Sequence, residues 1–573
     1  MRFHARRLFA LASAVLIGAS LTACSDDSPT EPTPQPPAAP TGVSATSTGT
    51  TSIRVVWNQV SGAASYEVDR AEGSGALSSY KTGLTATFLE DTGLKEGTQY
   101  RYVVRAVDGS LKSGNSSETS ATTGTTPPPA PKVATVTGVP LSRTFFADTT
   151  YILQGYVKVS NGATLTIQPG TKIVGDTLVP GSSLWVLRGS KIMAEGTAAA
   201  PIVFTSQRAE GNRAPGDWGG LVIVGNAPIN RTANPIFTEG PTGAAENYAG
   251  GNNFNDNSGS LKYVRVEFAG YDVSNGGGQE LNSISSYAVG RGTTYDYVQS
   301  MAGLDDSFEF WGGGADIRHM VSFEAGDDHY DFTEGYQGRG QFLIALQTSV
   351  LTPRPGTGTV SSDPRGFEGD GCENDKAGCT YANAPYTMPV FANFTVVGPG
   401  TGVFSGTDGN AAVVRRGGAA SFVNGILSRW PGVGFSIRDD ETKALMDADT
   451  LYIRNVILAE NGANFEAPRS GRFGEVVKDS AAAWKVTEST IAALFDGTLP
   501  VSSTAVTGTT LGIKPKAGSA AVAGGLSSFA NTPLIGRVQN FFGSQMPATA
   551  YIGAADPAAS TQWWEGWTNW KRN

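Results

Sequence analysis

The sequence predicts an all-β protein, with a small sandwich-like unit followed by a long solenoid of stacked strands. One pattern occurs twice within residues 295–341, because a shift of 22 residues aligns YDYVQSMAGLDDSFEFWGGGAD with IRHMVSFEAGDDHYDFTEGYQG. Short runs of β-branched and aromatic residues, separated by Gly and Pro turns, recur along most of the chain. Glycine contributes 73 of 573 residues and charged residues only 16%, a composition typical of turn-rich β proteins.

The repeat predicts which residues stack on one another. Each period forms one coil of a β-solenoid, and equivalent residues in successive coils lie about 4.8 Å apart. The aromatic residues that alternate with polar ones are expected to form inward ladders: Phe308, Phe310, Tyr330 and Phe332. The same alignment stacks three acidic pairs: Asp305 on Asp327, Asp306 on Asp328, and Glu309 on Asp331.

These acidic pairs need neutralisation, because like charges at strand spacing repel by about 1 kcal/mol in water and several times more when partly buried. We therefore predict that the six carboxylates are ligands of a divalent cation, most simply Ca²⁺, which prefers clustered oxygen ligands. Full solvation of the acidic face, or neutralisation by Arg318 and Arg339, stays open as an alternative. Glu368, Asp370 and Asp375 would complete such a site if their loop folds back over the coils.

The N-terminus predicts export and lipid anchoring. Three arginines precede an apolar run at residues 8–21, which is too short for a comfortable membrane span and typical of a signal peptide over residues 1–23. The run ends in LTAC, which resembles a bacterial lipobox and implies a lipid on Cys24. The following serine resembles the pattern of outer-membrane lipoproteins. A Pro-rich tether over residues 24–40 is expected to hold the folded part away from the membrane.

The remaining two cysteines, Cys372 and Cys379, form an even pair in an oxidising compartment, which predicts a local disulfide. A metal-ligand pair is the alternative, but no second pair of Cys or His residues lies near it in the sequence. The pair belongs to a Gly- and Pro-rich segment, residues 352–389, which is predicted to be a long excursion from the coils.

Residues 41–124 form the first predicted folded unit. Alternating strands at residues 53–57, 65–70 and 100–107 are separated by turn-rich segments. The unit resembles a fibronectin type III domain, with Trp57 at the position of the core tryptophan and LKEGTQY, residues 94–100, matching the tyrosine-corner segment. The resemblance implies a spacer rather than a binding module. A linker over residues 125–132 follows.

Residues 133–573 form the second predicted domain, in which strand and turn keep alternating. Asn393, Asn424 and Asn455 lie 31 residues apart and are expected to form a side-chain amide ladder at one corner. Residues 475–495 have helical periodicity and predict one or two short helices that form an insertion or a lateral cover.

The second domain resembles the right-handed parallel β-helix proteins of bacterial surfaces, the pectate-lyase-like group. The segments DDSFEFWGG, GDDHYDF, GFEGDG and the closing YIGAADP…WWEGWTNW are most similar to exported β-helix proteins without an assigned reaction. The resemblance predicts the fold better than the function, because this fold hosts lyases, hydrolases, adhesins and inert stalks.

Enzymatic activity stays open as an alternative. GDD at residues 326–328 is similar to an element of polygalacturonases, and two carboxylates at a suitable separation could cleave a glycosidic bond. The Gly-His-Gly and Arg-x-Lys elements of that family are absent. The candidate catalytic residues would be Asp305, Asp306, Asp327, Asp328 and His329. For His329 we favour a surface imidazole beside a carboxylate over a general base.

Four tryptophans near the C-terminus, Trp563, Trp564, Trp567 and Trp570, have two interpretations. Exposed indoles would stack on sugar rings, whereas buried indoles would cap the open end of the solenoid, and we favour capping.

The sequence as a whole predicts a surface protein that is lipid-anchored and extracytoplasmic, in the outer membrane of a bacterium. It is predicted to be non-enzymatic and to bind glycan, with a Ca²⁺ site. The alternative is a polysaccharide lyase or glycoside hydrolase. The net charge of −9 and the lack of a basic stripe argue against nucleic acid as a partner.

Overall fold

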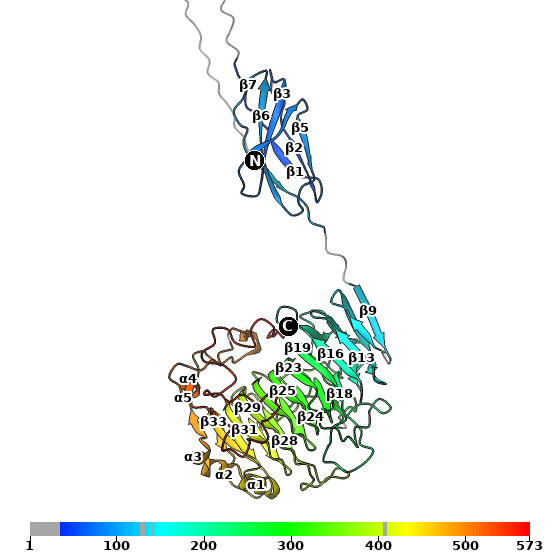
Figure 1. The fold of residues 1–573 in the computed structure, drawn as a ribbon, viewed down its shortest axis with the longest axis vertical. Coiled ribbons are helices and arrows are strands. Elements are labelled where there is room, and N and C mark those ends of the chain that lie inside the picture. Colours follow the sequence, from blue (N-terminus) through cyan, green and yellow to red (C-terminus); the bar gives the residue numbers. More distant parts are fainter. Residues whose placement is uncertain are drawn as a thin grey trace, which may run out of the picture. The chain divides into compact units, whose positions relative to one another are not determined.

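The computed structural model describes residues 35–126, 132–138, 142–276, 278–404, 409–509 and 511–572. The chain forms two compact units, Met1–Ala130 and Pro131–Asn573, each of which has its own core (Figure 1). The signal peptide, Cys24 and most of the predicted tether lie outside the described residues, so lipidation stays a prediction. Within the described part, no helix combines the length and the apolar character that a membrane span requires.

The first unit is a sandwich of two antiparallel sheets. One sheet has the order β1-β2-β5, and in the other β4, β3, β6 and β7 lie side by side while β8 also pairs with β6. The strands are β1 (Ser44–Ser47), β2 (Ser52–Val56), β3 (Ser65–Glu72), β4 (Ser78–Leu84), β5 (Phe88–Thr92), β6 (Gln99–Asp108), β7 (Leu111–Lys112) and β8 (Thr119–Thr122).

Two features that the sequence predicted for the sandwich are confirmed. Trp57 is buried in the core, where its ring meets Tyr66 edge-on with centroids 5.4 Å apart. The hydroxyl of Tyr100 accepts a hydrogen bond of 3.0 Å from the backbone N–H of Lys95. This bond to a backbone group a few residues upstream is the tyrosine corner of the immunoglobulin-like sandwiches.

The second unit is a β-helix built from parallel strands. One long sheet has the order β9-β11-β14-β17-β19-β23-β25-β27-β29-β31-β33-β35, and a second has the order β12-β15-β18-β22-β24-β26-β28-β30-β32-β34. The long-sheet strands are β9 (Lys132–Thr137), β11 (Thr149–Gln154), β14 (Lys172–Gly175), β17 (Ile202–Ser206), β19 (Gly259–Glu267), β23 (Thr294–Met301), β25 (Asp316–Phe323), β27 (Arg339–Leu346), β29 (Val390–Val397), β31 (Ser421–Ser428), β33 (Ile453–Ala459) and β35 (Thr487–Ser489).

The second, ten-stranded sheet carries the site described below. Its strands are β12 (Tyr156–Val159), β15 (Ser183–Val186), β18 (Gly220–Val224), β22 (Ile284–Tyr287), β24 (Phe308–Trp311), β26 (Tyr330–Thr333), β28 (Phe367–Asp370), β30 (Ala412–Arg415), β32 (Val433–Ile437) and β34 (Ala463–Phe465). β28 lies inside the segment 352–389, which we predicted to be an excursion. That prediction is wrong for these four residues, because they form a regular rung of the sheet.

The first coils have a third column of strands, β10 (Arg143–Phe145), β13 (Thr164–Ile167) and β16 (Lys191–Glu195). β19 pairs with β16 through its first half and with β17 through its second half, so the two columns merge into one long strand. Tyr263 stands between the two halves with φ of 49°, in the left-handed region. A left-handed residue turns the strand without ending it.

The left-handed residue recurs in every long strand that follows, and these residues form a column on the outside of the long sheet. The column consists of Tyr263, Tyr297, His319, Phe342, Asn393, Asn424 and Asn455. Its first four rings stack, with centroids 4.3, 4.2 and 5.1 Å apart.

The three asparagines of this column do not form the amide ladder that we predicted. The Asn393 amide donates to Thr549 Oγ1 at 2.7 Å, and the Asn424 and Asn455 amides donate to backbone carbonyls of Leu526 and Gly524. A side chain on a left-handed residue points outward from the corner, toward the segment packed there, and not along the coil axis. The asparagines therefore have the structural role that we predicted, but they hold the C-terminal segment instead of one another.

Inside the coils, the predicted aromatic ladders are confirmed. Phe308, Tyr330 and Phe367 stack with centroid distances of 5.4 and 5.3 Å, and all three are buried. Phe310 pairs with Phe332 in register and is also buried. The 22-residue repeat therefore does mark two consecutive coils.

Short helices cover one end of the β-helix. α1 (Asp440–Asp447) and α2 (Gly474–Asp479) lie at the last coils, and α2 and α3 (Ala481–Trp484) contact β32, β33 and β34 (Figure 1). Val477 is fully buried in the main core cluster. α4 (Ile491–Leu494) follows, so residues 475–495 do contain short helices, as predicted.

The C-terminal segment packs along the flank of the long sheet. It includes η1 (Ser503–Ala505) and α5 (Ala520–Ala523), and it buries a second apolar cluster against β23, β25, β27, β29, β31 and β33. A two-stranded hairpin, β20 (Tyr271–Asp272) with β21 (Glu280–Leu281), completes the described strands.

The four tryptophans belong to this lateral cover, so the burial that we favoured is confirmed for three of them, whereas its place at the open end of the solenoid was wrong. Trp564, Trp567 and Trp570 are at most 4% exposed, and Trp563 is half-buried against Tyr297 and His319. Their rings are not free to stack on sugars. They seal the outer face of the middle coils, where β19, β23 and β25 leave apolar side chains, instead of the open end.

Candidate functional site

The acidic residues of the twin repeats lie on the outer face of the ten-stranded sheet. In register, Glu309 of β24 pairs with Asp331 of β26, and Asp331 pairs with Glu368 of β28. Because successive residues of a strand point to opposite faces, these three carboxylates face outward while Phe308 and Phe310 face the core. We call the six carboxylates of the two repeats the acidic row: Asp305, Asp306, Glu309, Asp327, Asp328 and Asp331.

Two members of the acidic row also tie consecutive coils together. The backbone N–H of Asp306 donates to Asn282 Oδ1 at 3.0 Å, and the N–H of Asp328 donates to Asp306 Oδ1 at 2.8 Å. The N–H of Arg365 continues the series to Asp328 Oδ1 at 2.6 Å. The acidic row therefore forms a ladder between coils, as we had predicted for the asparagines. In this ladder a backbone N–H donates to a side-chain oxygen of the preceding coil.

Burial and mutual repulsion raise the pKa values of the acidic row. For Asp305 and Asp328, burial is the larger cause of a pKa well above the ordinary value, and the neighbouring Asp327 is the next. Burial and nearby carboxylates likewise raise the pKa values of Asp306, Glu309 and Asp331. Carboxyl groups with such raised pKa values must hold protons or meet a cation.

The oxygens are close enough for a cation to share. Three overlapping sets each have carboxylate oxygens within 4.8 Å of one another, and they run from Asp305–Asp306–Asp327 through Asp306–Glu309–Asp331 to Asp328–Asp331–Glu368. Oδ1 of Asp327 and Oδ1 of Asp331 are buried and accept no hydrogen bond from the described residues. Such oxygens fit the ligand set of Ca²⁺.

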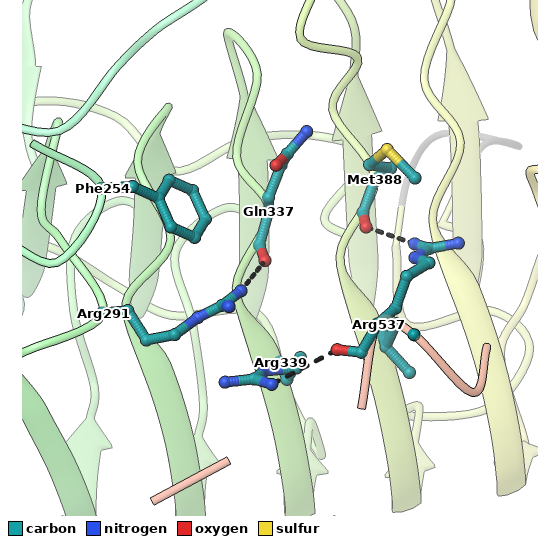
Figure 2. Close-up of a pocket in the computed structure, with 8 residues that line it drawn as sticks. Phe254, Arg291, Gln337, Arg339, Met388 and Arg537 are labelled. Atoms are coloured by element: carbon teal, nitrogen blue, oxygen red, sulfur yellow. Dashed lines mark hydrogen bonds between the residues drawn. The ribbon is translucent and has the colours of Figure 1, made fainter. Parts of the chain in front are cut away.

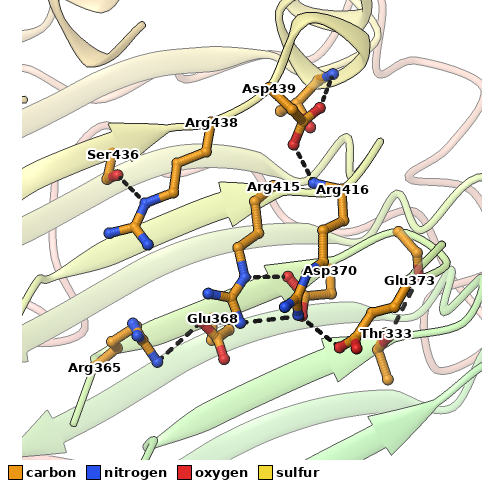
Figure 3. A network of polar contacts seen from close by, with 12 residues as sticks. Thr333, Arg365, Glu368, Asp370, Glu373, Arg415, Arg416, Ser436, Arg438 and Asp439 are labelled. Carbon is orange, nitrogen blue, oxygen red and sulfur yellow. Dashed lines mark hydrogen bonds and ion pairs between the residues drawn. The ribbon is translucent and has the colours of Figure 1, made fainter. Parts of the chain in front are cut away.

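One end of the row is neutralised by arginines, which sequence reasoning missed (Figure 3). Arg415 Nε lies 2.7 Å from Asp370 Oδ1, and its Nη2 lies 3.0 Å from Glu368 Oε1. Arg365 Nη1 reaches the same Glu368 oxygen at 2.9 Å, and Arg416 Nη1 contacts Asp370 at 2.5 Å. We call these five residues the paired cluster.

The pKa values follow from this pairing. Burial alone would raise the pKa of Asp370, but its ion pairs with Arg415 and Arg416 lower it below the ordinary value. Burial, and next the neighbouring Asp370, raise the pKa of Glu368 to about 7, although Arg365 and Arg415 oppose this. Asp370 is therefore electrostatically satisfied, whereas Glu368 and most of the acidic row are not.

Two further carboxylates extend the acidic row from outside the repeats. Burial, followed by repulsion from Glu280, raises the pKa of Glu239 to about 8, and burial also raises the pKa of Glu280. Lys376, on the disulfide loop, has its pKa raised by Glu373 and other nearby carboxylates despite its burial. No repeat marks Glu239 or Glu280 in the sequence, because both come from loops between coils.

The disulfide loop contributes differently from our prediction. Cys372 and Cys379 form the predicted disulfide, with a Cα–Cα distance of 5.0 Å. Glu368 and Asp370 do join the acidic face, but as part of the sheet and not of the loop. Asp375 is exposed, and none of the three carboxylate sets includes it.

Arg318 and Arg339 do not neutralise the acidic row. Arg318 pairs with Asp296 at 2.6 Å, and Arg339 pairs with Asp316, both on the long sheet. This alternative was wrong because the two arginines belong to the other face of each coil.

His329 is not the surface imidazole that we expected. It is fully buried, its Nδ1 lies 2.5 Å from Ser322 Oγ, and burial lowers its pKa to about 3. The residue follows Asp328 in sequence, but alternation along the chain turns its ring into the coil. A neutral, enclosed imidazole has no access to a substrate.

The two units define a class of architecture in which a fibronectin-like sandwich and a parallel β-helix occur in one chain. The chain belongs to the Pectate-lyase like beta helix domain family, which matches residues 139–498. The Fibronectin type III domain family matches residues 38–123. The sandwich and the β-helix that the sequence predicted are thereby confirmed.

Individual relatives cover only small parts of the chain. A poly(3-hydroxybutyrate) depolymerase of Ralstonia pickettii is 43% identical over 94 residues, which are 16% of this chain and 18% of that protein. A solved Fn3-like protein from Clostridium thermocellum is 36% identical, with a TM-score of 0.15, and covers 16% of this chain and 96% of its own. A β-1,2-glucanase from Parabacteroides distasonis is 22% identical, with a TM-score of 0.15, and covers 17% of this chain and 14% of its own.

Proposed function

We propose that this protein is a lipid-anchored cell-envelope protein that binds extracellular polysaccharide without cleaving it, and that Ca²⁺ bound to the acidic row stabilises its β-helix. The observation that carries the proposal is the set of three overlapping carboxylate groups, each within 4.8 Å, on one face of the sheet. A divalent ion would replace the protons that these carboxyl groups otherwise hold.

The cation explains features that solvation does not. The buried oxygens of Asp327 and Asp331 lack hydrogen-bond donors among the described residues. A solvated acidic face would keep pKa values near the ordinary range, whereas those of Asp305, Asp306 and Glu309 are raised well above it. Both features are expected of a site in which a metal supplies the missing positive charge.

Polysaccharide is the ligand class that the architecture favours. The chain belongs to a pectate-lyase-like family. A metal ion on an acidic surface can use its open coordination positions for hydroxyl and carboxylate oxygens of a glycan. The outward-facing row along β24, β26 and β28 would present such positions.

Polysaccharide cleavage through Asp305–Asp331 is the second candidate. The raised pKa values favour it, because a general acid must keep its proton at neutral pH. Against it, His329 is enclosed in the coil. Arg365 and Arg415 are held in ion pairs that raise their pKa values, so neither is suited to act as a base.

Thermal unfolding of the mature protein with Ca²⁺ and with chelator tests the cation. We expect Ca²⁺ to raise Tm by several degrees, since a ligand at a hundred times its Kd stabilises by about 2.7 kcal/mol. Asp331→Asn should abolish most of the shift. Asp375→Asn, on the exposed loop, is the matched control and should keep it. Identical curves with Ca²⁺ and chelator would remove the cation from the proposal.

Incubation with acidic and neutral polysaccharides separates the two functions. We expect the protein to sediment with an acidic polysaccharide in Ca²⁺ and to release no new chain ends. Unsaturated or reducing ends, lost in Asp331→Asn, would instead establish the lyase or hydrolase. A glycan array would then define which polysaccharide is bound.

A further inference from the structure

A cavity with three arginines lies at the edge of the long sheet, away from the acidic row (Figure 2). It is formed by the turns that lead into β23, β27 and β29 and by the C-terminal segment near residue 537. Its volume is about 210 Å³. The residues that line it are Phe254, Arg291, Gln337, Arg339, Met388, Val390, Gly536 and Arg537.

Arg339 forms the floor of this cavity and has its own counter-ion. Its side chain is 1% exposed, its Nε donates to Asp316 Oδ1 at 2.8 Å, and its Nη2 pairs with the other oxygen of Asp316. The remaining N–H groups donate to backbone carbonyls of the C-terminal segment, including that of Asn540 at 3.1 Å. This guanidinium is therefore saturated, and it holds the segment in place.

Arg291 forms only a long ion pair with the same carboxylate, that of Asp316. Its Nε lies 3.8 Å from Asp316 Oδ2 and makes no hydrogen bond within the described residues, although it is buried. Its Nη2 donates to the Gln337 carbonyl at 3.3 Å, and the guanidinium lies over the Phe254 ring, 4.6 Å from the centroid. The ring and the carbonyl hold the group at the cavity without neutralising it.

Arg537 enters the cavity from the opposite side and has no carboxylate within ion-pair distance in the described part of the chain. Its guanidinium donates to the carbonyls of Met388, of Thr450 at 3.0 Å and of Pro389 at 3.2 Å, and to Ser421 Oγ at 3.2 Å, so these four bonds occupy both Nη nitrogens. Burial lowers its pKa to about 10, which leaves it charged at neutral pH.

The cavity thus places three guanidinium groups around a single carboxylate, that of Asp316. Partly buried charges are costly unless an opposite charge meets them. Carbonyl dipoles reduce this cost at Arg537 but supply no net charge. Two positive charges therefore remain at one small cavity, and an anion would compensate them.

We propose that this cavity is a binding site for a small oxyanion, a carboxylate or a sulfate, held between Arg291 and Arg537 above the Arg339–Asp316 pair. Guanidinium groups bind such oxyanions through charge-assisted hydrogen bonds. Within the described residues Arg291 Nε has no other hydrogen-bond partner and would donate to the anion, while Arg537 would contribute its charge. The volume is below the ~300–1,000 Å³ of drug-sized pockets, so it suits one anionic group or one acidic sugar residue. This inference does not depend on the proposed cation site.

Equilibrium dialysis of the mature protein tests the site with two probes, labelled sulfate and galacturonate, at constant ionic strength. We expect saturable binding of one anion per chain for at least one probe, and no binding of galactose, which lacks the carboxylate. Saturation by sulfate alone identifies a tetrahedral oxyanion, whereas saturation by galacturonate identifies an acidic sugar. No saturable binding of either probe up to roughly 10 mM would overturn the proposal.

Variants locate the anion. Arg291→Gln should weaken binding about tenfold or more, and Arg537→Gln should do the same. Arg188→Gln is the control, because this exposed arginine also donates to backbone carbonyls, those of Gly225 and Ala249, but lies elsewhere. If Arg537→Gln loosens the C-terminal segment, Arg291→Gln still tests the site, because the Arg291 side chain donates to the Gln337 carbonyl and not to that segment. Equal binding by Arg291→Gln and the parent protein would overturn the site.

Discussion

The acidic row and the paired cluster occupy the same outer face of one sheet, yet they solve the same electrostatic problem differently. In the paired cluster, the register places Arg415 beside Asp370 on the next rung. In the acidic row, the register places Asp331 beside Glu309. Parallel stacking brings any outward-facing residue close to its neighbour in the next coil, so the identity of one residue per coil decides between attraction and repulsion.

The difference shows in which region the carboxylates need a counter-charge that the protein's own side chains do not supply. The pKa of Asp370 is lowered by its arginines, so its charge stabilises the fold. The pKa values of Asp305 and Asp306 are raised by burial and by neighbouring carboxylates, so their ionisation opposes the fold. A cation at the acidic row would make the two regions equivalent.

The largest expected effect comes from breaking the paired cluster. Arg415→Met leaves Asp370 and Glu368 buried with fewer counter-charges, and removing one partner of a buried ion pair typically costs about 3–5 kcal/mol. Urea denaturation should show this loss. Adding Asp370→Asn to Arg415→Met should recover part of the stability. A single variant as stable as the parent would mean that the arginines contribute little.

The pH dependence sharpens the comparison next. In chelator, buried carboxyl groups of this face hold protons that the unfolded chain has already released. Burial raises their folded pKa values, to about 7 for Glu368 of the paired cluster and to about 8 for Glu239 beside the acidic row. Stability conferred by such groups is full below the unfolded pKa and is lost as pH rises through the folded pKa. We expect the free energy of unfolding to fall between about pH 6.5 and 8.5 by an amount on the order of 1–3 kcal/mol, and Tm to fall with it.

The two buried histidines do not contribute to the change in stability between about pH 6.5 and 8.5. Burial lowers the pKa values of His319 and His329, so their contribution is lost as pH falls below the unfolded value of about 6.5 and is constant above it. Ca²⁺ should flatten the decline above pH 6.5. A Tm that rises over this window in chelator would contradict the raised carboxyl pKa values.

A smaller effect is expected from removing one like charge. Glu309→Gln keeps an oxygen to accept the hydrogen bond from the Asn282 amide and removes a charge from the centre of the acidic row. In chelator it should stabilise the protein by on the order of 1 kcal/mol at pH 8. Differential scanning calorimetry would measure the gain. Glu441→Gln, on the exposed face of α1, is the control and should change nothing.

The smallest effect is expected at Lys376. Its ammonium lies on the disulfide loop, where its interaction with Glu373 is partly screened, since the side chain is 40% exposed. Lys376→Met should therefore destabilise by only about 0.5 kcal/mol, and less in high salt. Chemical denaturation at two salt concentrations tests this. A loss as large as that of Arg415→Met would place Lys376 among the residues that neutralise the face.

The sequence predicted the parts of the fold that repeat. The 22-residue shift correctly aligned Glu309 with Asp331 and Phe310 with Phe332, because each coil of a solenoid corresponds to one period of the sequence. It also predicted the disulfide, since an even pair of cysteines seven residues apart, in a chain predicted to be exported, favours a local bridge. The core tryptophan of the sandwich, Trp57, followed from the resemblance to fibronectin type III domains.

What did not repeat could not be placed from the sequence. Glu239 reaches the acidic row from a loop, and the neutralising arginines at 415 and 416 come from two coils further along. The four tryptophans carried a clear signal for burial but none for which surface they would cover. The direction of the asparagine side chains depended on a left-handed backbone, which no residue spacing reveals.

The lateral packing of the chain end changes what kind of solenoid this is. The Asn569 amide donates to Glu267 at 3.0 Å, its N–H donates to Gln299 at 2.7 Å, and Arg265 donates to the Trp567 carbonyl at 3.0 Å, across about three hundred residues of sequence. An ordinary repeat protein gains stability coil by coil, with each coil sensing only its neighbours. Here residues 567–569 fasten coils that lie about three hundred residues earlier, so coils distant in sequence are coupled to one another and not only to their neighbours.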